Sequence, residues 1–120
     1  LPVSVPSHCR LMDPVATRLG EALAAVPLRA PGVPVIHNVD ARPRQDADAI
    51  RAALAEQVRR PVRWVDCVQA LRDSGAVTLV EAGPGRVLSG LARRIDRALA
   101  ALPVDDPDTL AAALEAVKGA

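Results

Sequence analysis

Residues 1–9 read LPVSVPSHC, an apolar segment that gives way to polar residues. The stretch 1–5 is rich in β-branched residues and is bounded by Pro6, a pattern that predicts a short buried strand. His8 then follows the carboxyl end of that strand, and in open α/β sheets ligands bind in the crevice outside these ends. Because histidine exchanges protons near neutral pH, His8 is the first candidate for a functional residue.

The rest of the chain is expected to alternate strands with helices. Further strands are predicted at 33–36 and 76–81, and helices at 11–26, from Asp46 or Asp48 to about 60, at 62–73, 86–101 and 108–118, with an acidic linker at 103–107. This order indicates a short parallel sheet flanked by helices. The three strand ends, at Ser7-His8, His37-Asn38 and Gly83-Pro84-Gly85, would then lie on one side of the sheet, which favours a site there.

Length and composition exclude several classes of function. The 120 residues carry a net charge of +1 with acids and bases interspersed, so a nucleic-acid partner is not expected. No apolar run reaches the roughly 20 residues of a membrane span. Two cysteines suit a reducing cytoplasm, and with the two histidines they lack zinc-binding spacing, so no metal is expected. The start at Leu1 within a strand, and a thin sheet with unprotected edges, suggest a piece of a larger protein.

Pro61 gives Gln57 an unusual backbone carbonyl. In a helix the carbonyl of residue 57 would accept from the N–H of residue 61, and proline has none. That carbonyl either bonds water or accepts a hydrogen bond from an imidazole Nδ1–H. In the second case it would hold a histidine with Nε2 facing a nucleophile, the task of the carboxylate in a Ser-His-Asp triad.

Four short motifs occur together in the chain: VPSHC at 5–9, VIHNVD at 35–40, QV at 57–58 followed by PVRW at 61–64, and EAGPGRVL at 81–88 followed by Gly90-Leu91. Each motif alone is weak, but their order and spacing are specific. Together they resemble the carboxyl-terminal part of bacterial malonyl-CoA:acyl-carrier-protein transacylases, over essentially the whole chain.

The resemblance implies a fold, an activity and two site residues. The fold is the carboxyl-terminal half of an α/β-hydrolase-like acyltransferase domain, spanning residues 1–120. The upstream half, with its Gly-His-Ser-Leu-Gly nucleophile elbow and a ferredoxin-like insertion, lies outside this segment. The activity is malonyl transfer from malonyl-CoA to the phosphopantetheine thiol of acyl carrier protein in fatty acid biosynthesis, by a Ser-His ping-pong mechanism. His8 matches the general base, and the backbone carbonyl of Gln57 matches the group that orients it. No cofactor is implied, and the segment alone is expected to be inactive.

Four further residues are candidates for substrate binding. Ser7 points away from His8 on an extended segment, so we expect it to line the acyl pocket rather than to act as nucleophile. Asn38 either bonds loop backbone or lines the pocket. Gly83 and Gly85 serve a strand-to-helix turn, and the helix that follows could also present its N–H groups to pantetheine or phosphates.

Two alternatives to the transacylase remain open at this point: a non-catalytic subunit that docks carrier protein, and a segment of a polyketide-type acyltransferase. Partners expected under the leading hypothesis are the carrier protein, a coenzyme A thioester and the missing upstream half of the same enzyme, in the cytoplasm. A cluster of arginines, Arg51, Arg59, Arg60 and Arg63, is explained either as a solvated helix face or as a docking patch for an acidic carrier protein.

Overall fold

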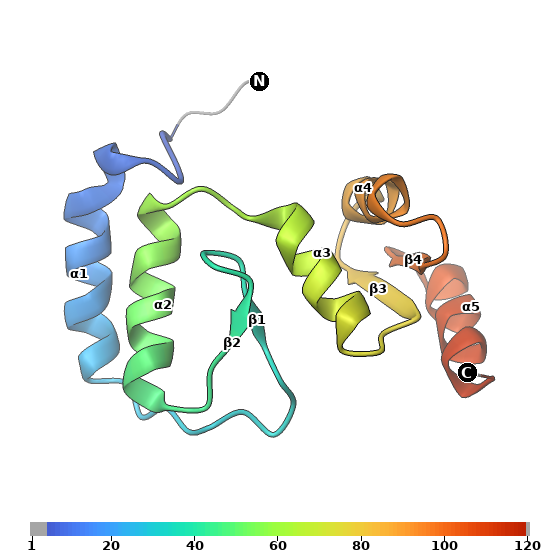
Figure 1. The fold of residues 1–120 in the computed structure, drawn as a ribbon, viewed down its shortest axis with the longest axis horizontal. Coiled ribbons are helices and arrows are strands. Elements are labelled where there is room, and N and C mark those ends of the chain that lie inside the picture. The colour runs from blue at the N-terminus through green and yellow to red at the C-terminus, as the bar shows by residue number, and fades with distance from the viewer. Residues whose placement is uncertain (1–4, 120) are drawn as a thin grey trace. The chain divides into compact units, whose positions relative to one another are not determined.

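The computed structural model describes residues 5–119, which fold into two compact units that divide between Ala70 and Leu71 (Figure 1). Each unit is described here by itself, as unit 1 and unit 2. The strand predicted at residues 1–5 lies outside the described residues, except for Val5, which is part of a bend.

Unit 1 is built around two helices that pack side by side. Its elements are the 3-10 helix η1 (Arg10–Met12), α1 (Asp13–Ala24), the strands β1 (Ile36–His37) and β2 (Arg42–Pro43), α2 (Ala47–Arg59) and the start of α3 (Trp64–Asp73). Small residues lie where α1 and α2 meet: Ala16 is buried, and a Cβ added to Gly20 would lie 4.0 Å from the Ala55 Cβ. Asp46 is the N-cap of α2: its carboxylate accepts a hydrogen bond from the Ala49 N–H at 2.8 Å.

The strand predicted at 33–36 differs from the observed one. Only Ile36 and His37 form a strand, and they pair antiparallel with Arg42 and Pro43. The chain turns back at Ala41, whose N–H donates to the His37 carbonyl at 2.8 Å. This tight hairpin satisfies the backbone locally, so the segment pairs with its own continuation and not with a parallel strand.

Unit 2 is a strand–helix–strand–helix unit. Its elements are β3 (Thr78–Ala82), α4 (Val87–Ile95), β4 (Ala100–Val104) and α5 (Pro107–Lys118). The strands β3 and β4 are parallel, with Leu79 opposite Ala101 and Ala82 opposite Val104. A parallel pair requires a crossover connection, which α4 provides, and α5 follows β4 and packs against it.

The helix predicted at 86–101 and the linker predicted at 103–107 are wrong in their boundaries. The helix ends at Ile95, and residues 100–104 form β4. Asp96 causes the break: its backbone is extended, and its carboxylate accepts from the Ala98 N–H at 2.8 Å, which starts a turn. The apolar run that follows fits a helix face and a buried strand equally well, and pairing with β3 decides for the strand.

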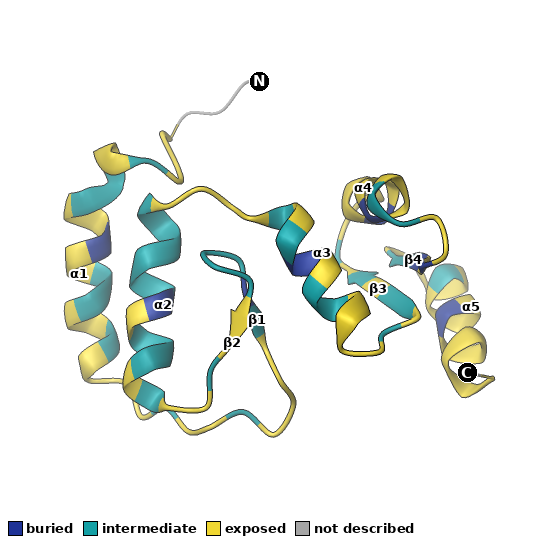
Figure 2. Cartoon of the chain, viewed as in Figure 1, coloured by how far each residue is buried: buried dark blue, intermediate teal, exposed yellow. Residues whose placement is uncertain are grey.

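Figure 2 colours the buried residues of each unit, and most of them have small side chains. Among the described residues, Val68 is the largest side chain that is fully buried, and the remaining buried apolar residues are five alanines, Cys67 and Leu99. None of the described helices is both long and apolar enough to span a bilayer.

Ala101 tests how tightly unit 2 is packed. Its side chain is 1% exposed, while Ala100, its neighbour in the same strand, is exposed on the other face. We expect Ala101→Leu to lower the free energy of unfolding by about 1–3 kcal/mol, because the enlarged side chain has no space. Ala100→Leu is the matched control and should have little effect in urea denaturation. Equal losses of unfolding free energy from both substitutions would contradict the assignment of Ala101 to the buried face of β4 and Ala100 to the exposed face.

Candidate active site

His8 is attached to the end of α2 by two hydrogen bonds. Its ring Nδ1 donates to the Gln57 carbonyl at 2.8 Å, and its backbone N–H donates to the Val58 carbonyl at 2.9 Å. The bond to Gln57, left open by the residue spacing, is therefore present in the structure. Two consecutive carbonyls of one helix end thus hold both the main chain and the side chain of His8.

Pro61 explains why both carbonyls are free. It has no N–H to offer Gln57, and proline disfavours the helical conformation of the residue before it. Arg60 is accordingly extended, with φ −110° and ψ 150°, and its N–H makes the last helical bond, to Glu56 at 3.0 Å. The N–H of residue 62 is turned out of the helix as a result, so Val58 also loses its donor.

The hydrogen bond fixes the tautomer of His8. A carbonyl oxygen can only accept, so Nδ1 must carry a proton whenever the bond is formed. In the neutral ring Nε2 then has the free lone pair and can take a proton. This is the arrangement that a general base requires.

The backbone of His8 lies in the left-handed region, with φ 63°. This conformation is uncommon for a residue with a Cβ and costs on the order of 1 kcal/mol or more. The two bonds to α2 offset that cost. Strain at a residue with a free imidazole nitrogen is typical of functional sites.

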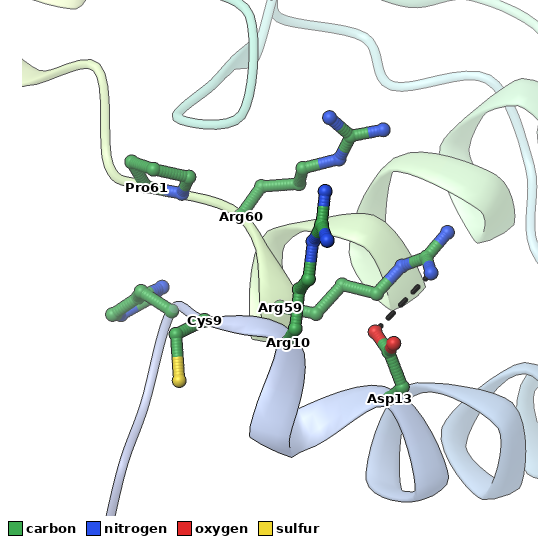
Figure 3. Close-up of a pocket in the computed structure, with 7 residues that line it drawn as sticks. Cys9, Arg10, Asp13, Arg59, Arg60 and Pro61 are labelled. Atoms are coloured by element: carbon green, nitrogen blue, oxygen red, sulfur yellow. Dashed lines mark hydrogen bonds and ion pairs between the residues drawn. The ribbon is translucent and has the colours of Figure 1, made fainter.

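A cavity of about 460 Å³ opens beside His8. Its other lining residues are Cys9, Arg10, Asp13, Arg59, Arg60 and Pro61, shown in Figure 3. The Cys9 thiol donates to the Pro6 carbonyl at 3.2 Å, so it is directed to the backbone. Neither Ser7 nor Asn38 lines this cavity, and their roles in substrate binding stay predictions.

The predicted arginine cluster is largely neutralised within the chain. Arg59 and Arg60 both bond Glu56, and Arg63 bonds Asp66 at 2.7 Å. Arg51 pairs with Asp48 and also bonds the carbonyls of Leu23 and Val26, at the end of α1. This pairing favours the ordinary explanation, a solvated surface held by ion pairs.

His37 and Asn38 lie in and after β1. His37 is 6% exposed, and burial, together with the nearby Arg44 charge, lowers the pKa of its imidazole. The Asn38 carbonyl accepts from the Arg63 N–H at 2.8 Å, while its side-chain oxygen is buried without a partner in the described structure. In the described part of the chain no group of three or more His, Cys, Asp and Glu side chains is arranged to hold a metal.

Gly83 and Gly85 belong to unit 2 and form the turn between β3 and α4. Both have positive φ, 143° and 98°, which a residue with a Cβ rarely adopts. The first N–H groups of α4 already have a partner: the Glu81 carboxylate accepts from Leu88 N–H at 3.0 Å, and from the N–H and hydroxyl of Ser89 at 2.7 Å each. The structure therefore supports the role of the glycines in the turn. The N–H groups of Leu88 and Ser89 already have an acceptor, the Glu81 carboxylate, in the place where a phosphate would bind.

Three features of the site were not foreseen from the sequence: the bond to Val58, the positive φ of His8, and an ion pair of Arg59 with Asp13 at 3.2 Å. The first had a usable signal, since a residue before proline leaves the helical conformation and frees a second carbonyl. The other two depend on how η1 and α1 meet α2, which has no local signature.

Comparison with known proteins gives a consistent result. Malonyl CoA-acyl carrier protein transacylase of Escherichia coli (strain K12) is 48% identical over 115 residues, which cover 96% of this chain and 37% of that protein. The crystal structure of malonyl-CoA:acyl carrier protein transacylase from Xanthomonas oryzae pv. oryzae matches with a TM-score of 0.93 at 52% identity, over 97% of this chain and 37% of that one. No protein-family model matches the chain.

A third similar structure contains a partner. It is a type II polyketide-synthase acyl carrier protein in complex with its malonyl-transacylase, with a TM-score of 0.92 and 47% identity over 96% of this chain and 37% of that one. These matches confirm the resemblance to malonyl-CoA:acyl-carrier-protein transacylases and the predicted fold class. The chain spans a little over a third of the length of these relatives.

Replacing Pro61 tests the origin of the His8 contacts. In Pro61→Ala, residue 61 gains an N–H and Arg60 is free to become helical, so α2 extends and competes for both carbonyls. We expect the hydrogen-exchange protection of the His8 amide to fall about five-fold, the equivalent of one net hydrogen bond of about 1 kcal/mol. Pro27→Ala, beyond the end of α1, is the matched control. An unchanged His8 amide in a chain with a lengthened α2 would contradict this explanation.

Glu81 makes the stability of unit 2 depend on pH. The hydrogen bonds from Ser89 hold the pKa of Glu81 below its ordinary value of 4.5. A carboxyl group whose pKa is lower in the folded than in the unfolded state stabilises the fold above its unfolded pKa. That contribution disappears as the pH falls through the folded value. We expect Glu81→Gln to lower the melting temperature at pH 7, and its difference from the unmodified chain to shrink below pH 4.5. Glu21→Gln, on α1, is the control. A difference independent of pH would argue against this role.

Proposed function

We propose that this chain is the carboxyl-terminal part of a malonyl-CoA:acyl-carrier-protein transacylase, in which His8 is the general base. The observation that carries the proposal is the hydrogen bond from His8 Nδ1 to the Gln57 carbonyl, which leaves Nε2 free to accept a proton. The similarity to transacylases over nearly the whole chain supports it.

The proposed reaction has two half-reactions. A serine hydroxyl from polypeptide outside these 120 residues gives its proton to His8 Nε2 as its oxygen attacks the malonyl thioester carbonyl. The C–S bond then breaks, and Nε2 returns the proton to the departing coenzyme A thiolate. In the second half, the phosphopantetheine thiol of the carrier protein gives its proton to Nε2 and attacks the malonyl-serine ester. The serine oxygen leaves and takes the proton back. The Gln57 carbonyl orients the imidazole throughout.

Exposed apolar side chains support the need for further polypeptide. Leu11 in unit 1 is 73% exposed, and Val87 in unit 2 is 69% exposed. Among the described residues, the other exposed large apolar side chains include Val33, Val77, Val15, Val80, Leu110, Leu114 and Val117. A domain of this length that folds alone buries most such residues. We infer that the upstream half of the enzyme covers part of this surface and contributes the nucleophile.

The partners follow from the same proposal: malonyl-CoA as donor and an acyl carrier protein as acceptor. The solved complex of a similar transacylase contains a polyketide carrier protein, and this favours a second candidate, transfer to a polyketide carrier. Supplying fatty-acid and polyketide carriers side by side distinguishes the two. A cytoplasmic location is also proposed, since Cys9 and Cys67 are free thiols.

A chimera tests the proposed function. This chain replaces the matching segment of the E. coli transacylase, which supplies the remainder of the enzyme. We expect the chimera to form a covalent malonyl-serine and to load carrier protein, whereas the 120-residue chain alone forms no adduct. His8→Ala should slow transfer by about 10²–10⁴-fold, the usual contribution of a general base.

The matched control is His37→Asn, because His37 is the other histidine of the chain and does not line the cavity beside His8. It should leave transfer close to that of the parent chimera. A folded chimera that binds carrier protein without forming any malonyl adduct would instead support the docking module. A His8→Ala chimera with full activity would refute the role of His8.

A further inference from the structure

Four consecutive residues at the end of α2 act together on the segment that carries His8. The carbonyls of Gln57 and Val58 hold the ring and the backbone of His8. The next residue, Arg59, reaches across to Asp13, the first residue of α1, with Nη1 3.2 Å from the carboxylate. Glu56, one residue before Gln57, fixes Arg59 from the other side.

Glu56 orients Arg59 for this contact. Its Oε1 accepts from Arg59 Nε at 2.9 Å and also from Nη2. Because Nε and Nη2 are used by Glu56, Nη1 is left on the side that faces Asp13, as Figure 3 shows. Arg59 and Arg60 together hold the pKa of Glu56 below its usual value, so this carboxylate stays ionised.

The short segment between His8 and Asp13 packs against α2, but within the described residues no hydrogen bond joins it to that helix. It consists of Cys9 and η1, and its hydrogen bonds are local: Cys9 Sγ donates to the Pro6 carbonyl, Met12 N–H to the Cys9 carbonyl and Asp13 N–H to the Arg10 carbonyl. The strained backbone of His8 stands at one end of this segment and the Arg59–Asp13 ion pair at the other. Fixing the far end reduces the freedom of the strained end to relax away from α2.

We propose that Arg59 is a positioning residue for His8, which acts through Asp13 to keep the His8 turn closed on the end of α2. The catalytic meaning of this role rests on the proposed function, whereas the contact between α1 and α2 does not. Arg59 touches no reacting group. Instead, it increases the fraction of molecules in which the His8 imidazole is hydrogen-bonded to the Gln57 carbonyl.

The expected effect is modest. The side chains of Arg59 and Asp13 are 37% and 49% exposed, and ion pairs with that much solvent contact are weak. Without the ion pair, the equilibrium ratio of the closed to the open form of the turn should therefore fall about two- to five-fold. A change of this size at His8 is measurable as local opening even when the rest of the unit is unaffected.

Amide hydrogen exchange of the 120-residue chain tests the proposal without any activity. In Arg59→Ala, protection of the His8 amide should fall about two- to five-fold, while that of Leu54, in the middle of α2, stays the same. Arg60→Ala is the matched control: Arg60 bonds the same Glu56 and lines the same cavity, but this ion pair stays within α2 and its cap and does not reach α1. It should leave the His8 amide unchanged.

A double-mutant cycle separates positioning from general destabilisation. Asp13→Asn should reduce His8 protection like Arg59→Ala, and the double variant should lose no more than either single variant. If Arg59→Ala unfolds the chain, Asp13→Asn alone decides. Unchanged protection in these variants, an equal loss in Arg60→Ala, or additive losses would overturn the proposal. Because no catalysis is measured, these outcomes are independent of the chimera experiment.

Discussion

The arrangement of the site depends on the way in which α2 ends. Pro61 removes one N–H and forces Arg60 out of the helical conformation, and these two effects leave the carbonyls of Gln57 and Val58 without helical donors. Unpaired carbonyls at a helix end need partners. His8 supplies both, one from its ring and one from its backbone, and it accepts a strained φ to do so. Because the Gln57 carbonyl needs a donor, the hydrogen bond that satisfies it also fixes the orientation of the His8 imidazole.

The glycine turn of unit 2 follows the same physical logic at the opposite kind of helix end. There the first N–H groups of α4 need acceptors, and the side chain of Arg86, at the cap position, does not cap the helix but bonds Asp105. Glu81, at the end of β3, provides its carboxylate to Leu88 and Ser89. In both units a residue from outside the helix supplies hydrogen-bond partners to the helix end. Neither contact requires a large hydrophobic core, which fits a chain whose buried side chains are mainly alanines.

Much of this could be predicted from local signals. Caps and apolar periodicity located α1, α2, α3 and α5, and the missing N–H of Pro61 pointed to the Gln57 carbonyl. The signals failed where tertiary pairing decides. Residues 100–104 are mostly apolar and could continue a helix face, and only the parallel partner β3 makes them a strand. Residues 36–43 form a hairpin because the chain turns at Ala41, which has a φ of 59°. Such a turn usually contains glycine, so the sequence contains no local signal for it. The Arg59–Asp13 pair joins residues 46 positions apart, so spacing alone could not reveal it.

The tautomer of His8 in the unmodified chain is the most direct test of this account. Nitrogen-15 chemical shifts of the neutral imidazole, recorded by NMR above its titration range, distinguish a protonated Nδ1 from a protonated Nε2. The hydrogen bond to the Gln57 carbonyl predicts that the proton resides on Nδ1, with His37 as a second, independent histidine in the same spectrum. A neutral His8 protonated mainly on Nε2 would show that the ring is not held by α2, and the basis for its role as a proton acceptor would be lost.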